Sequence, residues 1–359
     1  MNKYFAYLVV GVLIFQFFSC SRQITKTAAK TESVIYPSPP DTARIQYLTT
    51  ISGSSDVTGN QSAFSKFVLG ESSSKPIGKP YGIAVSGGKM YICDPGLSGL
   101  EIIDLTKNTF DYFTPGGKGQ FQFPLNCFID EDGSLYVADG GRLQIIVFDK
   151  NLEYVASFGS GEKFKPTDVF VYKDKIWVPD MNNNKVNVYG KDTHELLYSF
   201  PDTTKNTPGY LYMPTNLYVT DDKVYVSDIG GFDIKVFSLD GKFLKSIGSQ
   251  GDKIGQFARP KGIAVDDDLN IFVVDAGFEN VQIFDKDGNI RMFFGGPYKG
   301  RGDMWLPAKV TISYDKLKFF QKFVDKDFSL NYLIFVSNQY GPDKINVYGA
   351  IEPRQIRTK

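Results

Sequence analysis

The chain has 359 residues, 42% of them hydrophobic, and its 40 Lys and Arg are balanced by 40 Asp and Glu. A neutral chain without a run of basic residues lacks the electrostatic signature of nucleic-acid binding, so no nucleic-acid partner is expected. The only histidine, His194, lies in the turn sequence GKDTHE (190–195). A single histidine cannot form a zinc site built on several histidines, and its position in a turn argues against a Ser-His-Asp triad. No catalytic residues of these kinds are therefore predicted.

The N-terminus reads MNKYFAYLVVGVLIFQFFSC, in which one Lys precedes a mostly apolar stretch that ends at Ser19-Cys20. The stretch is short for a membrane span and is typical of a secretory signal peptide over residues 1–19. A small residue directly before Cys20 resembles the bacterial lipoprotein cleavage box. This resemblance implies that Cys20 is lipidated and anchors the protein in the cell envelope, and the absence of Asp after Cys20 implies the outer membrane of a Gram-negative bacterium. An uncleaved anchor or an incidental Cys is the alternative.

Residues 20–43 are polar, lack periodicity and contain the sequence PSPP, which favours an extended tether. The run RIQYLTTI (44–51) has the apolar and β-branched composition of a strand. Residues 53–80 then form an unusually long connection, in which the spacing of apolar residues predicts a short helix over 62–69. Everything that follows is repetitive.

From residue 80 the chain repeats one pattern six times. Each unit starts with a Pro, continues into an apolar run, passes a polar turn, and reaches a second run that ends in Asp or Asn. A third apolar run follows in every unit and a fourth in five of them. The six first runs are PYGIAV (80–85), PLNCFI (124–129), PTDVFV (166–171), PTNLYV (214–219), PKGIAV (260–265) and PAKVTI (307–312).

Each unit predicts short strands, because runs rich in Val, Ile, Tyr and Phe alternate with turns rich in Gly, Asp and Asn. Units of about 40 to 50 residues with four strands are the sequence signature of a β-propeller. We predict an all-β, six-bladed propeller of four-stranded antiparallel blades over residues 44–351, followed by a tail at 352–359. The sixth unit lacks a fourth strand, so the run 44–51 is expected to complete it as an N-terminal clasp strand. The ring is expected to be monomeric.

The motifs of the repeat resemble those of a known family. The repeat resembles the NHL repeat in four successive features: Gly-x-Phe ahead of the Pro, Gly-Ile-Ala-Val, an apolar run that ends in Asp, and a final Val-x-Ile-Phe-Asp run. Gln256 to Gly288 matches this pattern almost throughout, and the third and sixth units depart from it most. The resemblance implies the propeller fold but no single activity, because NHL propellers include protein-binding modules, RNA-binding modules, lyases and hydrolases.

The residues that end the second runs form a set of five Asp and one Asn. One such residue per blade is too regular for catalysis and suits side chains that accept hydrogen bonds from loop backbone. The sequence DDDLN (266–270) lacks the Gly of an EF-hand loop, so we interpret it as a strand turn. Cys93 and Cys127 are interpreted as free, buried thiols, with a disulfide as the alternative. The six residues are Asp94, Asp139, Asp180, Asp228, Asp275 and Asn338.

The third position of each first run breaks the repeat. Two units carry Gly there, whereas three others carry the oxygen-bearing side chains of Asn126, Asp168 and Asn216, and the sixth carries Lys309. By analogy with the fold, these residues line the mouth of the channel at the axis of the ring. Calcium takes such oxygen ligands, and propeller lactonases resemble this arrangement. We expect local turn caps and no cofactor, with a calcium site formed by Asn126, Asp168 and Asn216 as the alternative.

The face on which the first strands begin, here called the mouth face, is the predicted site of function. Its loops carry aromatic and polar groups that the repeat does not require, and a rigid scaffold presents functional groups on loops. We predict a membrane-anchored, exported binding scaffold that captures a protein or small ligand there, and a calcium-dependent lactonase or esterase-like hydrolase is the alternative. On the opposite face, an insertion at 313–331 predicts a helix that packs on the ring or docks a partner. The expected binding residues are Tyr81, Asn126, Asp168, Tyr212, Asn216, Trp305, Lys309 and Tyr340.

Overall fold

The computed structural model describes residues 33–58, 74–159 and 163–354. The predicted signal peptide, the lipidation site Cys20 and the helix expected over 62–69 lie outside the described residues. Residues from Val34 onward form one compact unit. Within the described part of the chain, no helix is long and apolar enough to cross a membrane.

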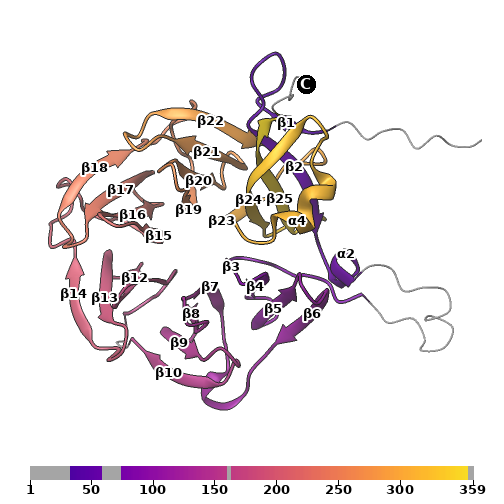
Figure 1. Ribbon diagram of the computed structural model, residues 1–359. Coiled ribbons are helices and arrows are strands. Elements are labelled where there is room, and N and C mark those ends of the chain that lie inside the picture. The colour runs from indigo at the N-terminus through magenta and orange to yellow at the C-terminus, as the bar shows by residue number, and fades with distance from the viewer. Residues whose placement is uncertain (1–32, 59–73, 160–162, 355–359) are drawn as a thin grey trace, which may run out of the picture. The chain divides into compact units, whose positions relative to one another are not determined.

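Six β-sheets surround a central axis as the blades of a propeller, which confirms the predicted fold (Figure 1). Five of the sheets have four antiparallel strands in chain order. Tight turns join many of the strands within a blade, and the turns DEDG (130–133), SLDG (238–241) and DKDG (285–288) place Gly133, Gly241 and Gly288 at φ values of 83°, 84° and 89°. Because such values strain any residue with a side chain, glycine is required at these turns.

The five regular blades are numbered here in chain order. They are blade 1, β3 (Ile83–Ser86), β4 (Lys89–Asp94), β5 (Gly99–Asp104) and β6 (Thr109–Phe113); blade 2, β7 (Pro124–Ile129), β8 (Leu135–Asp139), β9 (Gln144–Phe148) and β10 (Tyr154–Phe158); blade 3, β11 (Phe170–Tyr172), β12 (Lys175–Asp180), β13 (Lys185–Gly190) and β14 (Leu196–Phe200); blade 4, β15 (Pro214–Val219), β16 (Lys223–Asp228), β17 (Asp233–Ser238) and β18 (Phe243–Ile247); and blade 5, β19 (Pro260–Val265), β20 (Ile271–Asp275), β21 (Asn280–Phe284) and β22 (Ile290–Gly295).

Blade 6 joins the two ends of the ring. It contains β23 (Pro307–Ser313), β24 (Phe328–Asn338) and β25 (Ile345–Pro353) from the end of the chain, and β2 (Ile45–Ile51) pairs antiparallel with β25. The predicted clasp is therefore confirmed. A two-residue strand, β1 (Ile35–Tyr36), extends this blade to five strands, a feature that the repeat does not predict because it lies in the polar segment before the clasp.

The core is divided among the contacts between neighbouring blades. In β12, Ile176 and Val178 pack toward blade 2, whereas Trp177 between them packs toward blade 4. Both faces of the inner strands are thus buried, which explains why their sequences are almost continuously apolar. Cys93 and Cys127 are free and buried in the cluster between blades 1 and 2, as expected from the sequence.

The insertion in blade 6 forms less helix than its sequence predicts. It contains the short helix α4 (Leu317–Phe320) followed by the 3-10 turn η3 (Gln321–Phe323). Phe320 is fully buried against Phe335 of β24, so the helix packs on the ring. The prediction is wrong for Phe328, which belongs to β24 because β24 and β25 continue to pair beyond the length of the other blades. Two unpredicted turns, α2 (Ser54–Thr58) and η2 (Gly117–Gly119), complete the described elements.

Candidate functional site

The Asp that ends the second strand of a blade holds the mouth-face loops in place. In blade 2, Asp139 accepts hydrogen bonds from the N–H groups of Gln122 and Phe123 at 2.7 and 2.9 Å, on the loop that enters the blade. It also accepts from Gly141 and Arg142 at 2.9 Å, on the turn after β8. The carboxylates are therefore loop anchors, as predicted. The same four-bond pattern recurs at Asp94 and Asp275.

The anchored loops present large side chains to solvent. Trp305 and Tyr340 are each 47% exposed, Phe123 is 48% exposed and Met213 is 43% exposed. Large apolar groups held on one face favour association with another molecule. The sequence prediction missed Phe123 and Met213, although aligning the residue before each Pro would have found them. Around the ring that position alternates between a cation and an apolar side chain: Lys79, Phe123, Lys165, Met213, Arg259 and Leu306.

The axial residues predicted at the channel mouth do converge. The expectation of local turn caps is wrong for Asn126 and Asn216, because their side chains form hydrogen bonds to a neighbouring blade. Asp168 of blade 3 accepts a hydrogen bond from Asn216 Nδ2 at 3.1 Å, and Asn126 Nδ2 donates to the Thr167 carbonyl at 2.6 Å. Lys309 of blade 6 reaches Asp168 Oδ2 with its Nζ at 2.6 Å. All four side chains on the axis are buried. The first strands therefore close around a polar layer at the mouth of the channel.

The two glycines at this position have a structural explanation. A Cβ atom on Gly82 would lie 2.5 Å from Asn126 Cα, and one on Gly262 would lie 2.5 Å from Lys309 Cα. The inner strand of the next blade approaches too closely for any side chain. This requirement explains the glycine that PYGIAV and PKGIAV share at the third position.

The polar layer has oxygen donors of the kind that calcium prefers, but its charge is already balanced. Asn126 Oδ1 and Asn216 Oδ1 are buried without a hydrogen-bond partner, and Asp168 supplies one carboxylate. That carboxylate is neutralised by the ammonium group of Lys309. Among the described residues, no group of three His, Cys, Asp or Glu side chains is placed to hold a metal ion. As arranged, the layer fits a lysine rather than calcium.

A cavity of about 280 Å³ lies beneath this layer and ends at Lys309. It is lined by the first strands of all six blades. Its wall is asymmetric. On one side the rings of Phe128, Phe170 and Tyr218 pack next to one another in tilted orientations, with centroids 4.6 and 4.9 Å apart, whereas the other side carries Ala84 and Ala264. The polar layer separates this cavity from the mouth face.

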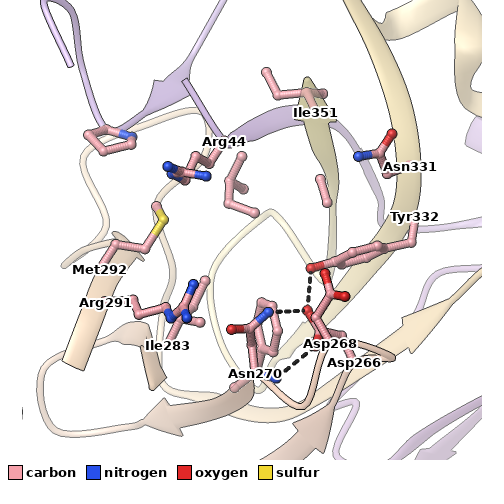
Figure 2. A pocket seen from close by; sticks show the side chains of 14 residues that line it. Arg44, Asp266, Asp268, Asn270, Ile283, Arg291, Met292, Asn331, Tyr332 and Ile351 are labelled. Carbon is pink, nitrogen blue, oxygen red and sulfur yellow. Dashed lines mark hydrogen bonds between the residues drawn. The ribbon is translucent and has the colours of Figure 1, made fainter. Parts of the chain in front are cut away.

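A second cleft, of about 450 Å³, lies between blades 5 and 6 (Figure 2). Asp266 accepts hydrogen bonds there from Tyr332 Oη at 2.9 Å and from Asn270 Nδ2 at 2.8 Å. The bonds from Asn270 close the turn at 266–270 between β19 and β20, which confirms its interpretation as a strand turn. Arg44 and Arg291 lie across the cleft from Tyr332. None of the predicted binding residues lines this cleft.

The remaining predicted residues fall into two sectors. Trp305 and Tyr340 are neighbours in blade 6, where the Tyr340 N–H donates to the Trp305 carbonyl at 3.4 Å. Tyr81 is half-buried on the loop into blade 1, and its carbonyl accepts from Ser337 Oγ at 2.5 Å. Tyr212 lies in blade 4 and its N–H is bound by Asp228 at 2.9 Å. The structure thus gathers three of the four aromatic residues where blades 6 and 1 meet.

The single histidine is far from this arrangement in the fold. His194 lies in the turn between β13 and β14, the two outer strands of blade 3. Its ring stacks on Phe158 with a centroid distance of 4.7 Å, and burial lowers the pKa of the imidazole. A stacked side chain on the outer hairpin is placed for packing rather than for acid–base chemistry on the mouth face.

Comparison with known proteins identifies the fold. No family model matches the chain. Protein brain tumor of Drosophila melanogaster is 31% identical over 94 residues, which cover 26% of this chain and 9% of that protein. The chain therefore aligns with only a small part of that relative.

Several solved structures share the architecture. A gluconolactonase from Xanthomonas campestris has a TM-score of 0.55 and 16% identity, covering 88% of this chain and 91% of that chain. A protein of unknown function from Bacteroides thetaiotaomicron has a TM-score of 0.57 and 18% identity, covering 86% of this chain and 76% of that chain. A virginiamycin B lyase from Staphylococcus aureus has a TM-score of 0.53 and 16% identity, covering 76% of this chain and 94% of that chain. The chain is a six-bladed β-propeller. At these identities the likeness extends to the fold alone.

Proposed function

We propose that this propeller is a binding module that captures a protein segment or small ligand on its mouth face. The observation that carries the proposal is the exposure of four large apolar side chains, Phe123, Met213, Trp305 and Tyr340, on loops that the Asp residues fix. Rigid aromatic anchors lose little conformational entropy on binding and often supply most of an interface's binding energy. Alternating cations between them add charge complementarity for an acidic partner.

The proposal includes the location of the protein. The N-terminal sequence favours a signal peptide with lipidation at Cys20, followed by a polar tether that would leave the monomeric ring free of the membrane surface. We place the protein in the cell envelope, on the outer membrane of a Gram-negative bacterium. The partner would then be another envelope component or a solute that passes through it.

A calcium-dependent hydrolase is the second candidate, favoured by the convergence of Asn126, Asp168 and Asn216 on the axis. The likeness to a gluconolactonase and to a virginiamycin B lyase is compatible with it but concerns the fold alone. For this function Lys309 would have to leave Asp168 and calcium would have to take its place. Because the ion pair is buried and short, we rank this function below binding.

The test compares substitutions of equal exposure on different parts of the ring. Full-length protein is immobilised in detergent, and captured molecules from the native envelope are quantified by mass spectrometry. Trp305→Ala and Tyr340→Ala should each remove the captured set. Phe293→Ala is the matched control, because Phe293 is 42% exposed on the outer strand β22. Equal capture by all four proteins would exclude the mouth face as the binding surface.

A further inference from the structure

Lys261 is a buried lysine that has no acidic partner among the described residues. It follows the Pro that begins β19, and its side chain is only 4% exposed. Its Nζ lies 4.9 Å from the centroid of the Tyr81 ring on the loop into blade 1.

Two further cations border this lysine. Arg259 lies two residues earlier on the same loop, and Lys79 lies two residues before Tyr81. Both are exposed, and Lys79 Nζ is 5.1 Å from the centroid of the Tyr340 ring. Among the described residues, none of the three cations forms an ion pair or a side-chain hydrogen bond to a carboxylate. The group therefore carries uncompensated positive charge.

A purely structural role does not account for this arrangement. Burying an ammonium group without a carboxylate is costly, and the contact with one aromatic ring offsets only part of that cost. The two other lysines that are buried within the described residues are paired: Lys235 Nζ lies 2.6 Å from Asp233, and Lys309 is paired with Asp168. An apolar side chain at position 261 would pack without the penalty. Retaining the lysine makes physical sense if something outside the chain supplies the negative charge.

We propose that Lys261, together with Lys79 and Arg259, forms a subsite for an oxyanion, a carboxylate or phosphate group carried by the molecule bound on the mouth face. This inference rests on the proposed binding function and specifies the chemistry of its ligand. Arginine and lysine are the side chains that bind such groups, the former through paired donors and the latter as a compact charge. Tyr81 and Tyr340 flank the subsite, so an adjoining flat or apolar part of the ligand would contact their rings.

The subsite should respond to pH in a defined direction. Burial, followed by the positive charges of Arg259 and Lys79, lowers the pKa of Lys261 to about 7. The other titratable groups that face this cluster are Tyr81 and, through it, Asp168. Because an oxyanion binds the protonated amine, affinity should be highest below pH 7 and should fall as the pH rises through the pKa. The expected loss between pH 6 and pH 8 is about tenfold.

Calorimetric titration of the full-length protein at low ionic strength tests the inference, with tricarballylate as the carboxylate probe and pyrophosphate as the phosphate probe. Wild type should bind at least one of them, which identifies the group. At pH 6, Lys261→Met should weaken that binding by at least about tenfold, and it should remove the loss of affinity that deprotonation of Lys261 causes between pH 6 and pH 8. The matched control is Lys286→Met, which removes an exposed lysine from the turn between β21 and β22. It should bind as wild type does.

Thermal melting separates loss of the subsite from loss of the fold. At pH 6 the Lys261→Met protein should melt no lower than wild type, because the substitution removes a desolvated charge. Failure of both probes to bind wild type, or unchanged binding by Lys261→Met, would overturn the inference. Since these titrations use small anions, their failure leaves the capture experiment with Trp305→Ala intact. Conversely, unchanged capture by Trp305→Ala beside normal anion binding would reject only the broader proposal.

Discussion

Replacing Lys309 with Met should destabilise the ring by several kcal/mol, about 3–5 kcal/mol for a buried pair that loses one partner. The substitution leaves Asp168, whose side chain is 1% exposed, as a charge without its partner at 2.6 Å. At an effective dielectric constant of about 20, the lost attraction is about 6 kcal/mol, and removing one partner of a buried pair typically costs about 3–5 kcal/mol. For a ring of this size that loss lowers the melting temperature by about 6 °C.

Equilibrium unfolding in urea, followed by the fluorescence of the buried Trp177, measures the effect. Adding Asp168→Asn to Lys309→Met should recover more than half of the lost stability. The second change removes the unpaired charge, and the amide oxygen at position 168 can still accept the hydrogen bond from Asn216 Nδ2. A loss below about 1 kcal/mol for Lys309→Met, or strictly additive losses in the double variant, would refute the importance assigned to this pair.

The same variant discriminates between the two candidate functions. With the ammonium group gone, one carboxylate and two unpartnered amide oxygens remain on the axis. If Lys309 occupies a latent calcium position, calcium should restore stability to Lys309→Met and leave wild type unchanged. If calcium stabilises the wild-type protein itself, the result favours the calcium-dependent hydrolase over the binding module.

Three further predictions follow from the clasp, a buried acid and the N-terminus. Deleting residues 1–52 removes β2 and should cause aggregation, whereas deleting 1–40 keeps β2 and should leave a soluble ring; identical melting of the two truncations would reject closure by the clasp. Burial, and secondarily the carboxylate of Asp94, raise the pKa of Glu101 to about 9. Because the folded state holds this proton above the usual carboxyl pKa, stability should fall as the pH rises from about 4.5 toward 9. Glu101→Gln should remove that pH dependence and raise the free energy of unfolding in urea by up to about 3 kcal/mol at pH 7. A variant that is less stable than wild type by the same amount at pH 5 and at pH 7 would contradict this prediction. Cys20→Ser should release the protein from the membrane fraction, and unchanged fractionation with unchanged mass would exclude lipidation.

The repeat made most of the fold predictable from the sequence, for local reasons. Pro, an apolar run and a Gly-containing turn recur at nearly constant spacing, and each carries the conformation of its own strand or turn. The clasp was predictable because one unit lacked a strand and one unassigned strand remained. Phe328 was misassigned because its apolar spacing fits a helix, whereas its place in β24 depends on pairing with β25.

The site was predictable only in part, because its contacts cross the ring. The convergence of Asn126, Asp168 and Asn216 follows from their shared position in three adjacent units. The pairing of Lys309 with Asp168 does not, since it depends on how far a long side chain reaches across the axis. Lys261 was missed for the same reason: its own run reads as an ordinary strand, and its partner Tyr81 belongs to the first unit.

The central claim is that binding occurs on the mouth face, and hydrogen–deuterium exchange with and without the captured molecule tests it most directly. We predict slower exchange in the loops around Phe123, Trp305 and Tyr340, and unchanged exchange in α4 and η3 on the opposite face. Protection confined to α4, η3 and the strand ends around the central cavity, with none in those loops, would contradict the account.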